Sequence, residues 1–100
     1  MWAQLIKARM KPGREDDIQR LQQEFEARGR DGSTGWVRSF GLQNQNDPQE
    51  YYTLVFFESE EKARENERTP EQAAMVQRLQ DHFEGPPEFV DLIPFYEASR

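Results

Sequence analysis

The chain has 100 residues, the size of one domain, so we expect a single domain over 1–100. Its 13 basic and 19 acidic side chains give a net charge of −6, and no run of Lys and Arg offers a surface for phosphates. Nucleic acid is therefore not expected as a partner. Cysteine is absent, which excludes disulfides, thiolate nucleophiles and thiolate metal sites.

The chain also lacks the patterns that address a protein to a membrane or to secretion. It begins without the basic start and apolar block of a secretory signal, and it has no run of about 18 apolar residues that could span a bilayer. We expect a cytoplasmic protein with no membrane partner. Aromatic residues make up 12% of the chain, which distinguishes it from disordered sequences of similar charge.

The N-terminal part predicts a strand followed by a helix. Residues 2–10 alternate in the period of a strand, and Pro12 with Gly13 ends it, because proline has no N–H and glycine allows a turn. Over residues 14–28, apolar side chains recur every three or four positions and acidic residues occupy the first turn, as in an amphipathic helix.

The middle of the chain predicts a hairpin. Residues 36–42 form a strand with Trp36, Arg38, Phe40 and Leu42 on one face. The turn-forming residues of 43–50 connect it to a second strand at 51–57. This second strand is apolar or aromatic on both faces.

Two helices and a last strand are predicted in the C-terminal part. Ser59 begins a short helix that extends to about Glu67. Thr69 caps a longer helix, with Pro70 at its first position, which is expected to end at Gly85. Residues 88–96 form a strand that is again apolar on both faces.

This order of elements predicts an α+β fold of the ferredoxin-like βαββαβ type, with a four-stranded antiparallel sheet. Helices cover one face of such a sheet, yet the strands at 51–57 and 88–96 carry large apolar side chains on both faces. A bare face of this kind is rare on soluble monomers. We therefore expect a homodimer that packs sheet to sheet.

Several short motifs occur in a characteristic order: Lys11-Pro12-Gly13, Gly35, Asp47-Pro48, Phe57-Glu58-Ser59-Glu60-Glu61 and Thr69-Pro70. In these motifs the chain resembles the antibiotic biosynthesis monooxygenase family of dimeric α+β barrels, from Trp2 to Tyr96. The resemblance implies a dimer that forms such a barrel, and a pocket between sheet and helices for an apolar, often polycyclic or phenolic molecule. Some members oxidise such molecules with oxygen and no cofactor, others degrade haem, and many have no known activity.

The chain departs from the family pattern at two positions. Phe57 stands where members often have a tryptophan, and Asn66 where they often have a histidine. The residues used by the haem-degrading branch align with Ile6, Asn66 and Val76, and the single histidine, His82, lies further along. Haem is therefore not expected, and we expect no cofactor and no metal.

Asn66 and His82 are the candidate catalytic residues. The Asn66 amide could bind a carbonyl or enolate oxygen of a substrate, and the alternative is a residue that only meets water on a charged helix. His82 is placed in the last turn of the longer helix, where its pKa would suit a general base, and the alternative is a surface histidine.

The candidate substrate-binding residues are aromatic, sulfur-containing or basic side chains on the predicted strands and helices: Arg9, Trp36, Arg38, Phe40, Tyr51, Phe57 and Met75. The aromatics and Met75 could form pocket walls or belong to an ordinary core. The two arginines could hold an anionic or carbonyl group, or form cross-strand ion pairs.

The sequence and the resemblance lead to one hypothesis and a rival. The hypothesis is a homodimer that binds an apolar aromatic metabolite and oxygenates it without a cofactor, by stabilising a substrate anion that reacts with oxygen itself. The rival is a dimer of the same fold that binds a ligand or another protein without catalysis. Fold alone does not decide between them.

Overall fold

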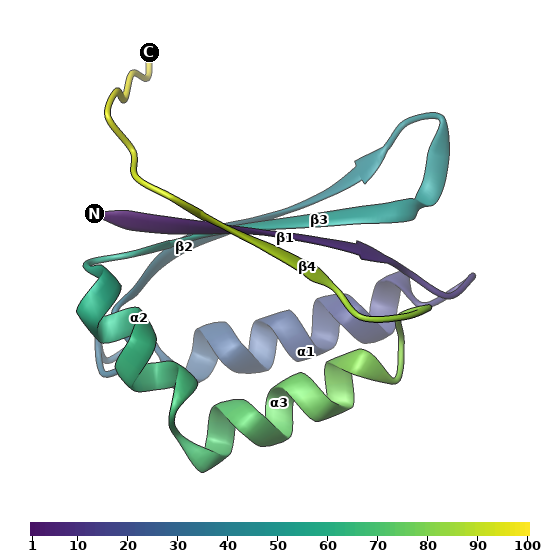
Figure 1. Cartoon of the computed structure of the whole chain (residues 1–100), viewed down its shortest axis with the longest axis horizontal. Coiled ribbons are helices and arrows are strands. Elements are labelled where there is room, and N and C mark those ends of the chain that lie inside the picture. Colours follow the sequence, from purple (N-terminus) through teal and green to yellow (C-terminus); the bar gives the residue numbers. More distant parts are fainter.

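The computed structural model describes residues 1–100 and consists of one sheet with helices on one side (Figure 1). The elements in chain order are β1 (Trp2–Arg9), α1 (Glu15–Arg28), β2 (Trp36–Asn44), β3 (Asp47–Phe57), α2 (Glu60–Glu67), α3 (Pro70–Gln80) and β4 (Glu88–Leu92). No helix has both the length and the apolar character needed to cross a membrane.

The sheet has four strands in the order β2-β3-β1-β4, and every neighbouring pair is antiparallel. The two central strands are therefore the first and third in the chain, with the hairpin partner β2 and the C-terminal β4 at the edges. This arrangement confirms the predicted α+β, ferredoxin-like fold.

The core lies between the sheet and the helices and has two clusters. One cluster joins the start of β1 and the end of β3 to α1 and α2, and its members are Trp2, Phe25, Val55, Phe57 and Ala63. The other lies at the opposite end, around Ala8, Met10, Ile18 and Phe83. Between the two clusters the helices are not packed tightly onto the sheet, and this gap forms the candidate site described below.

The predicted caps position the two C-terminal helices. Ser59 and Thr69 each accept a hydrogen bond from the backbone N–H three residues later, at Lys62 and Gln72. Such caps satisfy backbone donors that the first turn of a helix leaves free. Together they set the direction in which α2 and α3 leave the sheet.

The face of the sheet that points away from the helices is apolar and is not covered by the chain. Phe40 is 47% exposed, and its ring meets Phe56 edge to face at a centroid distance of 6.4 Å. Leu42 on β2 and Val90 and Leu92 on β4 are also exposed. The predicted two-sided apolar character of the sheet is present in the fold.

A bulge in β2 changes one predicted face. Trp36 pairs with Phe57 and Arg38 pairs with Phe56, so Val37 is the extra residue between two consecutive partners. A bulge of one residue reverses the faces on either side of it. Trp36 therefore lies on the helix side while Arg38, Phe40 and Leu42 lie on the open face, and the prediction that all four share a face was wrong.

The C-terminal strand is shorter than predicted. β4 ends at Leu92, which pairs with Ala3 near the start of β1. Beyond Leu92 the chain therefore has almost no residues of β1 left to pair with. Pro94 then has no N–H to donate. The next apolar residues are bare, with Phe95 97% exposed, and Figure 1 shows the tail leaving the sheet near the N-terminus, on the side away from the helices.

The helix predicted to reach Gly85 ends at Gln80 because the following residues bond to β1 instead. The Lys11 N–H donates to the His82 carbonyl at 2.9 Å, and the Glu84 N–H donates to the Arg9 carbonyl at 2.7 Å. Phe83 forms a bridge with Met10 and is buried. His82 therefore lies in a turn after α3, not in its last helical turn.

The loop before β2 holds α2 in place through Gly35. Its φ is +77°, and a Cβ built there would lie 2.6 Å from Cβ of Lys62 on α2. Gly13 has the same φ, with nothing within 4 Å of the added atom.

We expect both Gly13→Ala and Gly35→Ala to lose about 1–2 kcal/mol from the left-handed backbone. Gly35→Ala should lose more, because the backbone of α2 has to shift. Urea unfolding of the two variants measures the difference. Equal losses would show that the contact with Lys62 is not limiting.

Candidate functional site

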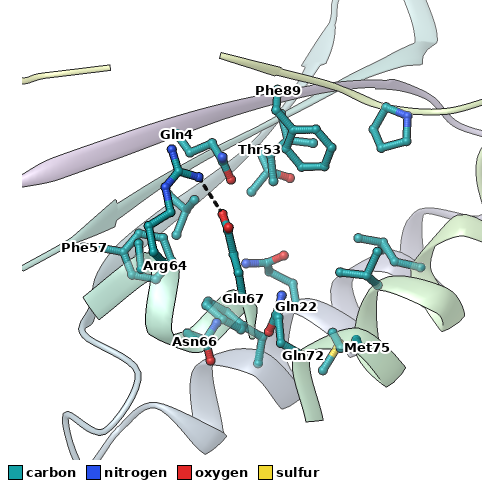
Figure 2. Close-up of a pocket in the computed structure, with 18 of the residues that line it drawn as sticks. Gln4, Gln22, Thr53, Phe57, Arg64, Asn66, Glu67, Gln72, Met75 and Phe89 are labelled. Atoms are coloured by element: carbon teal, nitrogen blue, oxygen red, sulfur yellow. Dashed lines mark hydrogen bonds and ion pairs between the residues drawn. The ribbon is translucent and has the colours of Figure 1, made fainter. Parts of the chain in front are cut away.

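A cavity of about 750 Å³ lies between the sheet and the three helices and is partly open to solvent (Figure 2). Its apolar wall comes from β1, β3, β4 and α3 and includes Trp2, Ile6, Phe57, Met75 and Phe89. Polar side chains enter it from several elements, among them Gln4, Gln22, Thr53, Asn66, Glu67 and Gln72. This combination of apolar walls and a few polar groups is typical of small-molecule sites.

Arg64 joins α2 to β4 at the edge of the cavity. Its guanidinium lies 2.6 Å from the Asp91 carboxylate on β4, 3.2 Å from Glu60 and 2.9 Å from Glu67. The same guanidinium stacks over the Trp2 ring at 4.9 Å. One arginine therefore connects the second helix, the first strand and the last strand.

Two pKa values respond to this contact. Hydrogen bonds from Gln4 and Arg64 lower the pKa of Asp91, and the bond to Asp91 is the main cause that raises the pKa of Arg64. Both groups are accordingly charged over the whole physiological range. The contact at this edge of the cavity is thus an ion pair.

Glu67 is the other carboxylate beside the cavity. Figure 2 shows its side chain extending from α2 toward the sheet, with its carboxylate next to Arg64. Asp91 is held by two partners, Gln4 and Arg64, whereas Glu67 has only Arg64. Glu67 is thus the carboxylate with more free capacity to accept a further hydrogen bond.

Asn66 is buried, with 5% of its surface exposed, and its Oδ1 accepts a hydrogen bond from Arg28 Nη1 at 3.0 Å. Arg28 Nη2 donates to Oε1 of Gln72 at 2.5 Å. The helix face that carries Asn66 is turned toward α1, so the alternative in which this residue only meets water does not apply.

Three of the predicted site residues meet at the cavity: Asn66, Phe57 and Met75. Phe57 also belongs to the core, and Met75 packs against the same cluster. Trp36 packs against that cluster from outside the cavity, and its Nε1 donates to Ser39 Oγ at 2.8 Å. Trp36 therefore packs against the core and does not line the cavity.

The remaining predicted residues lie elsewhere. Arg9 forms ion pairs with Asp47 at 2.9 Å and Glu84 at 3.5 Å, as the cross-strand alternative proposed. Arg38 stacks over Phe56 on the open face, 6.0 Å from the ring centroid, next to Phe40.

Tyr51 and His82 also lie away from the main cavity. Tyr51 lines a second cavity of about 380 Å³ between α1 and β2, and burial raises the pKa of its hydroxyl. His82 Nδ1 lies 2.9 Å from Arg14 Nη1. Because a guanidinium only donates, Nδ1 is the acceptor and the proton of the neutral ring resides on Nε2.

The site residues that sequence reasoning missed include Arg28, Arg64, Glu67 and Gln72. All four lie in charged or polar helical stretches that look solvated in a sequence. The pattern offered one signal, the position of Asn66 and Gln72 at the facing ends of two consecutive helices. No group of three or more His, Asp or Glu side chains is placed to hold a metal ion.

Because of the contact between Asp91 and Arg64, the free energy of unfolding depends on pH in the acid range. The pKa of Asp91 in the folded state is below the ordinary 3.8, so protonation favours the unfolded state. The stabilisation is present above about pH 3.8 and is lost as the pH falls through the lowered pKa.

We expect Asp91→Asn to be less stable than the parent protein at about pH 6 and to approach it at about pH 2.5. Urea unfolding at both values measures this. Glu61→Gln, at an exposed position of α2, is the control and should show no such convergence. A stability difference for Asp91→Asn that stays constant with pH would contradict the ion-pair account.

No family model matches the chain, and no curated protein matches it either. Solved structures do match. A protein assigned to the antibiotic biosynthesis monooxygenases, from Nitrosomonas europaea, is 16% identical with a TM-score of 0.76, covering 96% of this chain and 100% of its own. Another with that assignment, from Chloroflexus aurantiacus, is 18% identical with a TM-score of 0.73, over 99% and 98% of the two chains.

A third match is SnoaB, a cofactor-independent oxygenase from Streptomyces nogalater, in a variant with an asparagine replaced by alanine. It is 10% identical with a TM-score of 0.81, covering 99% of this chain and 97% of its own. The likeness in each case extends over the whole domain. The resemblance expected from the sequence motifs is confirmed in the fold: the chain has the fold of the antibiotic biosynthesis monooxygenase proteins.

Proposed function

We propose that this protein is a homodimer whose cavity binds an apolar aromatic molecule bearing a carbonyl or phenolic oxygen, and that it oxidises this molecule with O₂ and no cofactor. The observation that carries the proposal is the cavity itself, in which apolar walls surround a buried asparagine and a carboxylate. The fold shared with a cofactor-independent oxygenase supports the reaction class.

The size and lining of the cavity suit such a ligand. A volume of about 750 Å³ falls within the range of roughly 300–1,000 Å³ typical of ligand sites. Phe57 and Phe89 contribute aromatic surface on the sheet side, and Met75 contributes an adaptable thioether on the helix side. Flat polycyclic molecules bury much apolar surface between two such walls.

A ligand oxygen would bind at the polar end of the cavity. The Asn66 Oδ1 is occupied by Arg28, so the Nδ2 of this amide is the group left to donate to a ligand. A hydrogen bond from Nδ2 stabilises negative charge on a carbonyl or phenolate oxygen more strongly than it stabilises the neutral form.

For the bound molecule to react with O₂, a side chain must first remove a proton from it and so form an anion. In an anthrone, Glu67 takes a proton from the methylene carbon and leaves an anion whose charge resides on the oxygen. The anion passes an electron to O₂, the two radicals combine into a C–O bond, and the resulting peroxide anion takes the proton back from Glu67 to form a hydroperoxide. The hydroperoxide loses water to give a second carbonyl. One oxygen atom enters the product and the other leaves as water, so O₂ accepts all four electrons.

The dimer would cover the open face of the sheet. Phe40, Leu42, Val90 and Leu92 are exposed on this face, and the chain itself has no segment over it. A two-fold axis places the same apolar surface of a second copy against it. The exposed residues Ile93, Phe95 and Tyr96 belong to the C-terminal tail, which Figure 1 shows on the side of the sheet away from the helices, and they would add to the interface.

Oxygen uptake with 9-anthrone tests the reaction. We expect consumption by the parent protein, and a loss of about 100-fold in Glu67→Gln, which keeps the size and the contact with Arg64 but cannot accept the proton. Binding of 9-anthrone without oxygen should be unchanged.

Glu60→Gln is the matched control, because Glu60 also contacts Arg64 but does not line the cavity, so its rate should equal that of the parent. Binding without any uptake would support the non-catalytic rival. Neither binding nor uptake across a panel of anthrones and quinols would reject the proposed function.

Sedimentation at micromolar concentration tests the dimer. We expect a dimer for the parent protein and a monomer for Phe40→Glu, because a charge within an apolar interface is left without a partner. Ala74→Glu, on the exposed side of α3, introduces the same charge elsewhere and should remain dimeric. A monomeric parent protein would contradict the dimer.

A further inference from the structure

Arg28, in the last turn of α1, connects three helices without an ion pair, unlike three other arginines that bridge elements of this acidic chain. Arg9, Arg64 and Arg78 each pair with a carboxylate of another element. Arg28 forms no ion pair, and its two side-chain partners are neutral amides, Asn66 at 3.0 Å and Gln72 at 2.5 Å. Its positive charge is therefore not compensated by a neighbouring carboxylate.

The chemistry of the guanidinium determines how both amides are turned. Arginine has five N–H donors and no acceptor, so each amide must present its oxygen to it. The Nδ2 of Asn66 and the Nε2 of Gln72 then point away from Arg28. Neither nitrogen has a hydrogen-bond partner, and no side-chain nitrogen is buried without one, so both are accessible.

The two free amide nitrogens face the cavity and Arg28 does not. Asn66 and Gln72 both line the cavity, whereas Arg28 stands behind them. The three residues come from three different helices, α2, α3 and α1. Arg28 is itself held by stacking on the Phe25 ring, with its guanidinium carbon 5.7 Å from the centroid.

This arrangement has an electrostatic consequence. Hydrogen bonds in series polarise one another, and a charged donor at the start of the chain strengthens the donors at its end. An uncompensated charge behind two amide donors favours a ligand oxygen that carries partial or full negative charge. A neutral apolar group in the same place would leave both donors unpaired.

We propose that Arg28 is a positioning residue that orients the Asn66 and Gln72 amides as a paired donor, and that this pair selects ligands with an acceptor oxygen. The inference rests on the proposed function, since it concerns the same cavity. It adds two residues to the site, Gln72 as a contact and Arg28 as the group that acts through both amides.

Binding of two ligands that differ only at the oxygen provides the test. 9-Anthrone has a carbonyl where 9,10-dihydroanthracene has a methylene group. Both are titrated without oxygen while tryptophan fluorescence is followed, to which Trp2 in the cavity contributes. We expect the parent protein to prefer 9-anthrone by about tenfold or more. In Arg28→Met the preference should fall to about twofold or less, with the affinity for dihydroanthracene unchanged.

Matched variants distinguish the loss of amide orientation from a general effect of the substitution on folding. Arg20→Met removes an exposed arginine of the same helix and should keep the full preference. Arg28→Lys keeps a cationic donor and should recover part of the preference. Gln72→Leu should lose part of it, because one donor of the pair is gone.

A second measurement does not depend on a ligand. The side-chain NH₂ resonances of Asn66 and Gln72 should shift together in Arg28→Met and stay in place in Arg20→Met. Should Arg28→Met fail to fold, the Arg28→Lys and Gln72→Leu titrations still decide the matter.

Three outcomes would overturn the inference. The first is a parent protein that binds both ligands equally, and the second is an Arg28→Met protein that loses affinity for both by the same factor. Either leaves the aromatic pocket of the proposed function intact. A parent protein that binds neither of these ligands, nor any of the wider panel of anthrones and quinols, overturns the proposed function and this inference together.

Discussion

The arrangement of all three helices on one face of a four-stranded sheet is the constraint from which the other features follow (Figure 1). The sheet needs cover on two sides because its strands carry apolar groups on both. On the helix side, two compact clusters form at the ends of the sheet and a cavity remains between them. On the other side, the chain supplies no cover at all. The cavity and the bare face are thus two results of one arrangement.

Polar groups beside an apolar cavity are costly unless they are hydrogen-bonded, and two arginines meet most of that requirement here. Arg64 binds the carboxylates at the edge, and Arg28 binds the amides deeper between the helices. The two differ in consequence. Arg64 is neutralised by its partners, whereas the charge of Arg28 is passed on through neutral groups. At the edge of the cavity the charge of Arg64 is therefore balanced by carboxylates. At the end formed by Asn66 and Gln72, the charge of Arg28 favours a negatively charged ligand atom.

The strands and helices could be predicted from the sequence because their signals are local. The alternation in β3 and the caps at Ser59 and Thr69 lie within a few residues of what they determine. The bulge at Val37 and the end of α3 could not, because both depend on pairing with distant segments. The same holds for the site: Asn66 was predicted, but Arg28 is 38 residues away from it, and no local pattern relates the two.

Gln72 illustrates how one residue can serve the fold and the site together. The sequence marks it as the third residue of a capped helix, and its backbone N–H does bond to Thr69. In a full capping box its side chain would turn back to the N–H of Thr69, but that N–H donates to the Asn66 carbonyl. The side chain is thereby free to reach Arg28. The Asn66 carbonyl therefore binds the turn that follows α2, while the side chains of Asn66 and Gln72 flank the cavity. A change in the turn between α2 and α3 would thus alter the site as well as the fold.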